Sequence, residues 1–139
     1  MTDECFNKGL LRRMEKDTAR AIGSTGIARS FIKKAKANMK IGLHDVAFLM
    51  AYISMFQSVR AFLFSRGISE RSHYCAIKYA IENIKDEKIQ TVLEALDSYR
   101  ISRHRIQYDG KDIGKEDSEE AINDARRLAD FIENYIKSS

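Results

Sequence analysis

The sequence predicts an all-α protein, an up-down bundle of four to five helices in a single domain over residues 1–139. The chain contains no proline and only seven glycines, so long stretches lack any residue that interrupts a helix. Apolar residues recur at helical spacing through most of these stretches. A chain of 139 residues, 44% hydrophobic and 32% charged, suits one domain with a modest core.

Two helices are expected before Gly42. The first covers about residues 4–22, and the Gly-Ser-Thr-Gly segment at residues 23–26 is expected to interrupt the chain because it holds two glycines. Ser24 or Thr25 would cap a second helix over about residues 27–41. Gly42 would end this helix, as glycine does at many helix C-termini.

The third helix is expected to be the centre of the bundle. It starts at His44 or Asp45, stops at Gly67 and is apolar nearly all round. We expect four of its aromatic side chains to be mostly buried, namely Phe48, Tyr52, Phe56 and Phe62. Its longest apolar run, residues 46–56, is too short to cross a bilayer, which predicts a buried core helix.

A shorter helix and a long one follow. Ser69 is the candidate N-cap of the shorter helix, which runs through residue 84. Asp86 can cap the long helix, which then continues to Asp109 and Gly110.

The C-terminal part begins with a polar loop, expected over residues 111–118. Asp117 and Glu120 resemble a capping box, so the last helix is expected over residues 119–136. Its apolar side is rich in alanine, isoleucine and leucine, which suits packing against the bundle.

The composition limits the cellular setting and the partners. No signal peptide is visible, so a cytoplasmic protein without membrane association is expected. Cys5 and Cys75 could form a disulfide, but nothing marks the chain as secreted, and reduced thiols are expected. The net charge of +4 permits a nucleic-acid partner without demanding one.

No metal or cofactor site is predicted. Carboxylate-bridged metal centres in helical bundles need two Glu-x-x-His pairs, whereas only Glu70 and His73 form one here. His73 is therefore expected to cap a helix or to pack near its start. The glycines at residues 23–26 lack the lysine of a phosphate-binding P-loop.

The candidate site is a stripe of polar residues within residues 99–108. Arg100, His104 and Tyr108 are spaced four apart, which places them along one side of a helix, and Arg103 and Gln107 flank them. Arginine binds phosphate, histidine can move a proton near neutral pH, and a phenol can donate or accept a hydrogen bond. This combination suits a phosphodiester, although a solvated basic helix face is the alternative.

Such a stripe could cleave RNA without a metal. When the 2′-OH attacks the adjacent phosphate, a base must take its proton, a cation must stabilise the phosphorane and an acid should protonate the leaving oxygen. His104 could be the base or the acid, and Arg100 could clamp the phosphate. A homodimer that pairs two copies of this helix would supply a second histidine, so we expect a dimer.

The order of these motifs resembles the HEPN domain family over nearly the whole chain, from about residue 8 to residue 135. The motifs that carry the resemblance are Ala28-x-x-Phe31-Ile32-x-x-Ala35-x-x-Asn38-x-x-x-Gly42, then Ala47-x-x-x-Ala51-Tyr52-x-x-x-Phe56-x-x-x-Arg60-Ala61-x-Leu63-x-x-x-Gly67 with Ser72-His73 after it, and Arg100-x-x-x-His104-x-x-x-Tyr108.

The resemblance implies a helical bundle, a homodimer and a nucleotidyltransferase partner. Many members are RNA-cleaving toxins held in check by that partner, which implies catalytic roles for Arg100 and His104 and RNA contacts for Arg103, Gln107 and Tyr108. Catalytic members usually separate the arginine and the histidine by more than the three residues found here, and this difference favours an alternative. In the alternative, a non-catalytic HEPN module binds a nucleotidyltransferase, a nucleotide or RNA. A structural bundle without a ligand is the third possibility.

Overall fold

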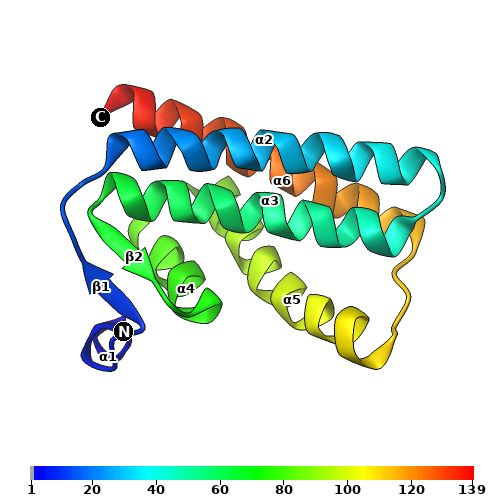
Figure 1. The fold of residues 1–139 in the computed structure, drawn as a ribbon, viewed down its shortest axis with the longest axis horizontal. Helices are drawn as coiled ribbons and strands as arrows, with labels where there is room; N and C mark the ends of the chain where they lie inside the picture. The colour runs from blue at the N-terminus through cyan, green and yellow to red at the C-terminus, as the bar shows by residue number, and fades with distance from the viewer. Residues whose placement is uncertain (1) are drawn as a thin grey trace.

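The computed structural model describes residues 2–139, which form six helices and a small two-stranded sheet (Figure 1). The helices are α1 (Asp3–Asn7), α2 (Thr18–Lys40), α3 (His44–Ser65), α4 (His73–Asn83), α5 (Glu87–Asp109) and α6 (Lys115–Ser138). The strands are β1 (Leu11–Arg13) and β2 (Ile68–Glu70). The predicted helical bundle is thus confirmed.

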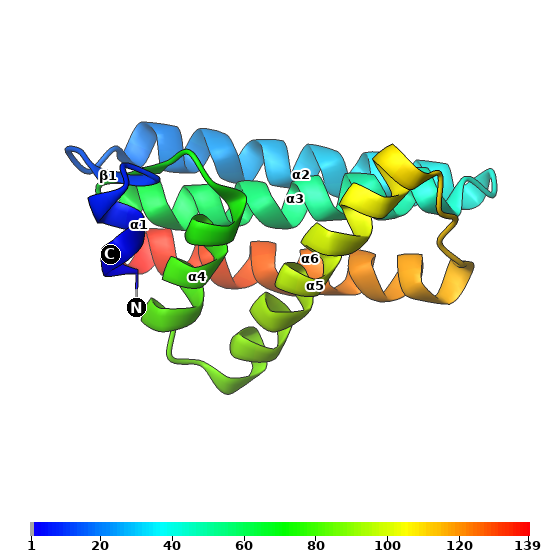
Figure 2. The same cartoon turned by 90° about the horizontal axis from the view of Figure 1, so that it is seen from below.

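Helix α3 lies at the centre of the bundle, where α2 and α6 run alongside it and α4 and α5 pack on another side (Figures 1 and 2). The four aromatic side chains expected in the core are buried, with at most 6% of each exposed, and these are Phe48, Tyr52, Phe56 and Phe62. By length and composition, α3 is the one helix in residues 2–139 that could cross a membrane. Most of its apolar stretch is buried in the bundle, as in the core helix of a folded domain.

Helix α2 runs without interruption through residues 23–26, so the predicted break there is wrong. Ser24 and Thr25 are buried, and the Thr25 hydroxyl donates a hydrogen bond to the Ile22 carbonyl within the helix. These small residues precede Ala28, whose carbonyl accepts a hydrogen bond from Ser54 on α3. Packing against α3 therefore offsets the helix-propensity cost of each glycine, about 1 kcal/mol.

The N-terminal segment also differs from the single helix predicted over residues 4–22. After the short helix α1, strand β1 pairs antiparallel with β2, with Leu11 opposite Glu70 and Arg13 opposite Ile68. Gly67, at φ 74°, lies before β2, and a side chain there would approach the Met14 carbonyl to 2.6 Å. The pairing depends on a distant part of the chain, which local helical spacing cannot reveal.

Cys5 and Cys75 form a disulfide, which corrects the expectation of reduced thiols. The bond joins α1 to α4 across a sequence separation of 70 residues. Thr2 adds a second link, because its hydroxyl donates a 2.9 Å hydrogen bond to Glu82 on α4. The N-terminal segment is therefore fastened to α4 and to the strand that precedes it.

Helix α4 begins at His73 with Ser72 as its N-cap, and the predicted cap Ser69 instead lies in β2. The Ser72 hydroxyl accepts a hydrogen bond from the Cys75 backbone N–H at 3.1 Å. Ser69 cannot serve as a cap because it lies within β2, where it is paired with Arg12 of β1.

The ends of α5 agree with the prediction, and the start of α6 does not. Asp86 caps α5 by accepting a hydrogen bond from the Ile89 N–H at 3.1 Å, and Gly110 ends it in the left-handed conformation. Helix α6 starts at Lys115, four residues before the predicted start at residue 119, so Asp117 lies within its first turn and does not cap it. Ser118 is buried in this first turn, where its hydroxyl bonds the His44 carbonyl and draws the turn onto α3.

Candidate functional site

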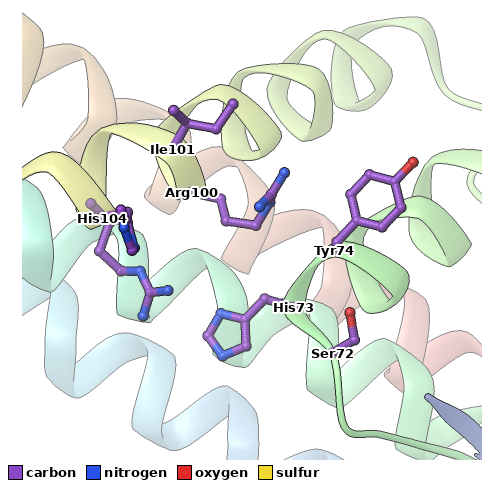
Figure 3. Close-up of a pocket in the computed structure, with 7 residues that line it drawn as sticks. Ser72, His73, Tyr74, Arg100, Ile101 and His104 are labelled. Atoms are coloured by element: carbon purple, nitrogen blue, oxygen red, sulfur yellow. The ribbon is translucent and has the colours of Figure 1, made fainter. Parts of the chain in front are cut away.

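A cleft of about 470 Å³ separates the N-terminal end of α4 from the middle of α5. Both helices contribute to its walls, and the side chains of Arg100 and His73 extend into the space between them (Figure 3). The lining residues are Ser72, His73, Tyr74, Arg100, Ile101, Arg103 and His104.

The cleft contains three of the five residues predicted for the site. Arg100, Arg103 and His104 line it, because a helical spacing of three or four residues places them on one side of α5. Gln107 and Tyr108 are exposed and do not line it. The Tyr108 ring lies 4.6 Å from the His104 ring, centroid to centroid, and is 72% exposed.

Two neighbours orient the Arg100 side chain. Its Nε donates a hydrogen bond to the Asp97 carboxylate at 3.2 Å, one turn earlier on α5. The guanidinium carbon also lies 5.3 Å from the centroid of the Tyr74 ring on α4, within the range of a cation–π contact. Among the described residues its one hydrogen bond uses Nε, so the terminal nitrogens can meet a ligand.

Arg103 packs against the core from the cleft wall. Its guanidinium carbon is 5.2 Å from the centroid of the Tyr52 ring, which belongs to the buried face of α3. Its Nε is enclosed and has no hydrogen-bond partner within residues 2–139. Arg103 therefore adds positive charge to the cleft wall, and its guanidinium has hydrogen-bonding capacity left unused.

His73 is one of four lining residues that the sequence analysis did not assign to the site, together with Ser72, Tyr74 and Ile101. Its ring stacks on Phe56 with a centroid distance of 3.7 Å, and its Nδ1 lies 2.8 Å from the Tyr52 hydroxyl oxygen. The sequence does show a histidine directly after Ser72, a residue type that can cap a helix. It does not show that α4 packs opposite Arg100, which is what brings His73 into the cleft. Glu70, its partner in the metal motif considered above, instead pairs with Arg60 at 2.8 Å.

The surroundings of His73 keep its ring neutral. Burial, followed by the charges of Arg103, Arg100 and Arg60, lowers the pKa of His73 from 6.5 to about 4. Burial raises the pKa of Tyr52 to about 12, so the phenol keeps its proton at neutral pH. The cleft thus combines fixed arginine charges with two uncharged hydrogen-bonding groups.

The lowered pKa predicts a pH dependence of stability. In the unfolded chain His73 binds a proton near pH 6.5, whereas in the folded chain it does so only near pH 4. The contribution of the neutral His73 ring to the free energy of unfolding is therefore complete above about pH 6.5 and is lost as the pH falls toward 4. Chemical denaturation at pH 7 and pH 5 should show a smaller loss of unfolding free energy in His73→Gln than in the wild type. Equal losses in both proteins would contradict the assignment.

The N-terminus of α4 adds a further anion-binding feature. The first backbone N–H groups of a helix have no partner within the helix and carry a partial positive charge. At α4, Ser72 accepts from Cys75, while residues 73 and 74 begin the helix at the edge of the cleft. Such a terminus beside two arginines suits a phosphate.

Tyr99 belongs to the predicted stripe region but faces away from the cleft. Its hydroxyl donates a 2.8 Å hydrogen bond to Asp124 on α6, and its ring packs edge-on against Phe48. Burial and the neighbouring Asp124 raise the pKa of Tyr99. Tyr99 therefore fastens α5 to α6.

Side chains that could hold a metal do not gather in residues 2–139, where no group of three or more His, Cys, Asp or Glu residues has suitable geometry. The cleft lining itself offers arginine, histidine, hydroxyl and backbone groups.

Comparison with known proteins identifies the family. The HEPN domain matches residues 24–135, which include α3, α4, α5 and every residue that lines the cleft. No curated protein matches the chain. Since the match covers most of the sequence and the helical bundle agrees with it, the chain belongs to the HEPN domain family.

Proposed function

We propose that this HEPN protein cleaves RNA without a metal, as the toxin of a pair with a nucleotidyltransferase antitoxin. One observation carries the proposal: Arg100, Arg103 and His104 of α5 line a single cleft with the N-terminal end of α4. HEPN domains are typically ribonucleases of toxin–antitoxin systems, often paired with such a partner, which supports this proposal.

The proposed reaction is an attack of the RNA 2′-oxygen on the adjacent phosphorus. His104 accepts the 2′-OH proton while Arg100 and Arg103 stabilise the charge on the phosphorane oxygens. The bond from phosphorus to the 5′-oxygen then breaks, and an acid protonates that oxygen. The products are a 2′,3′-cyclic phosphate and a free 5′-hydroxyl, and no water is consumed.

A homodimer would complete this machinery. His104 and Tyr108 are exposed on α5, so the same face of a second copy could approach and supply its own histidine as the acid. Gln107 and Tyr108 would then contact RNA or the second copy rather than the phosphate in the cleft.

The direct test uses purified protein and end-labelled RNA in EDTA. We expect cleavage that leaves 2′,3′-cyclic phosphate ends, and light scattering at micromolar concentration should give the mass of a dimer. In cells, induction of the wild type alone should stop growth and degrade RNA, while co-expression of a cognate nucleotidyltransferase should restore growth.

A non-catalytic binding module is the second candidate, and a specific observation favours it. Asp97 already holds Arg100, and only three residues separate Arg100 from His104. If RNA binds in the cleft and stays intact at every pH tested, the protein is a binding module.

A strict monomer in light scattering would remove the mechanism in which each of two copies supplies a histidine.

A further inference from the structure

The cleft holds a second histidine from the same chain. His73 and His104 stand on different helices and line the same space, with Arg100 from α5 between the two helices (Figure 3). The proposed cleavage chemistry gives His104 a role and leaves His73 without one. Its position therefore needs its own explanation.

Contacts from the core hold the His73 ring in one orientation. One face lies on Phe56, nearly parallel at an interplanar angle of 12°, and Nδ1 faces the hydroxyl of Tyr52. A phenol is the better donor of this pair and a neutral imidazole nitrogen the better acceptor. With Tyr52 donating to Nδ1, the ring proton resides on Nε2, the nitrogen that has no protein partner in the described residues.

We propose that His73 binds the phosphate of RNA in this cleft by donating a hydrogen bond from Nε2 to a non-bridging oxygen, with Tyr52 as the positioning residue that fixes the donor. This inference rests on the proposed function, because it assigns a residue to the same site. It differs from that function in needing no proton transfer at His73.

The charges around His73 favour such a neutral donor. The cations that face it are Arg60 from α3 and Arg100 and Arg103 from α5, and the carboxylates of Glu70 and Asp97 are paired with Arg60 and Arg100. An imidazolium here would be repelled by the arginines, whereas a neutral ring adds a hydrogen-bond donor without adding another positive charge. When a phosphate enters, its negative charge offsets the arginines and should raise the pKa of His73.

The test is nuclear magnetic resonance of the full chain labelled with 15N at its three histidines, His44, His73 and His104. The probe is a 2′-O-methyl RNA oligonucleotide, which lacks the attacking hydroxyl and so stays intact. In the free protein, His73 should be the neutral Nε2–H tautomer near neutral pH. With saturating probe, its Nε2 resonance should shift and its titration midpoint should rise, while His44 at the far end of α3 should not change.

Variants separate binding from packing. His73→Leu should weaken probe binding about tenfold, since a hydrogen bond to a charged group is lost, and His73→Gln should restore part of it. Tyr52→Phe keeps the ring and removes the hydroxyl, so His73 should become a mixture of tautomers and binding should weaken about threefold. Thermal unfolding of each variant identifies any loss caused by misfolding.

The outcomes are distinguishable. If the probe binds, Arg100→Ala weakens it, and the His73 resonances stay unchanged at saturation, then His73 is structural and this inference is overturned while the proposed function stands. If the wild-type protein neither binds the probe nor cleaves RNA, the proposed function and this inference both fail.

Discussion

Replacing His104 with alanine should slow RNA cleavage by about 10²–10⁴-fold, the usual contribution of a proton-transfer group. His104 lines the cleft beside the two arginines and is exposed, so its removal should leave the core intact. Arg100→Ala should cost about 10²–10³-fold by removing a donor to the charged phosphorane. Arg100→Lys should restore only part of the rate, because an ammonium cannot grip two phosphate oxygens in one plane.

Arg105→Ala is the matched control. Arg105 lies on α5 next to His104, carries the same positive charge as Arg100 and is exposed. Unlike those two residues, it does not line the cleft. Rates should be measured in EDTA under single-turnover conditions, so that product release does not hide the chemical step. A rate for His104→Ala equal to that of Arg105→Ala would show that His104 takes no part in the reaction.

Removing the disulfide should produce the largest change in stability. Cys5 and Cys75 close a loop with a sequence separation of 70 residues. For a loop of that length, the chain-entropy estimate of the stabilisation is about 4 kcal/mol. Urea denaturation of the double variant Cys5→Ser, Cys75→Ser should show this loss relative to the oxidised wild type.

The wild type treated with a dithiol reductant provides the comparison. It should lose nearly the same unfolding free energy, and the double variant should not respond to the reductant. Titration with a thiol reagent should find no free thiol in the unreduced, unfolded wild type, because these are its only cysteines. Two free thiols there would contradict the disulfide.

The sequence predicts those parts of the fold that depend on local patterns. Apolar residues all round one segment place α3 at the centre, and the Asp86 cap and Gly110 fix the ends of α5. The glycines at residues 23–26 mislead because burial of Ser24 and Thr25 against the bundle outweighs local helix propensity. The β1–β2 pairing and the disulfide join segments far apart in the sequence and leave no local pattern.

The same division holds for the candidate site. Helical spacing predicts that Arg100, Arg103 and His104 share one side of α5, and they do share a cleft. The opposite wall, with Ser72 and His73, depends on how α4 packs against α5. The spacing of residues within either helix does not predict how the two helices pack against each other. Gln107 and Tyr108 continue the stripe, but they extend past the region where α4 faces α5.

The disulfide and the small sheet also bear on where this domain can be cut. The family match begins at residue 24, inside α2, and leaves out every residue of α1 and β1. Arg13 of β1 pairs with Ile68 in the small sheet and Cys5 of α1 is bonded to Cys75, so these residues brace the wall of the cleft that α4 provides. A chain shortened to the family boundary would keep all the residues that line the cleft and lose the support that sets their spacing. The start of the family match and the start of the segment that supports the cleft therefore differ by about twenty residues.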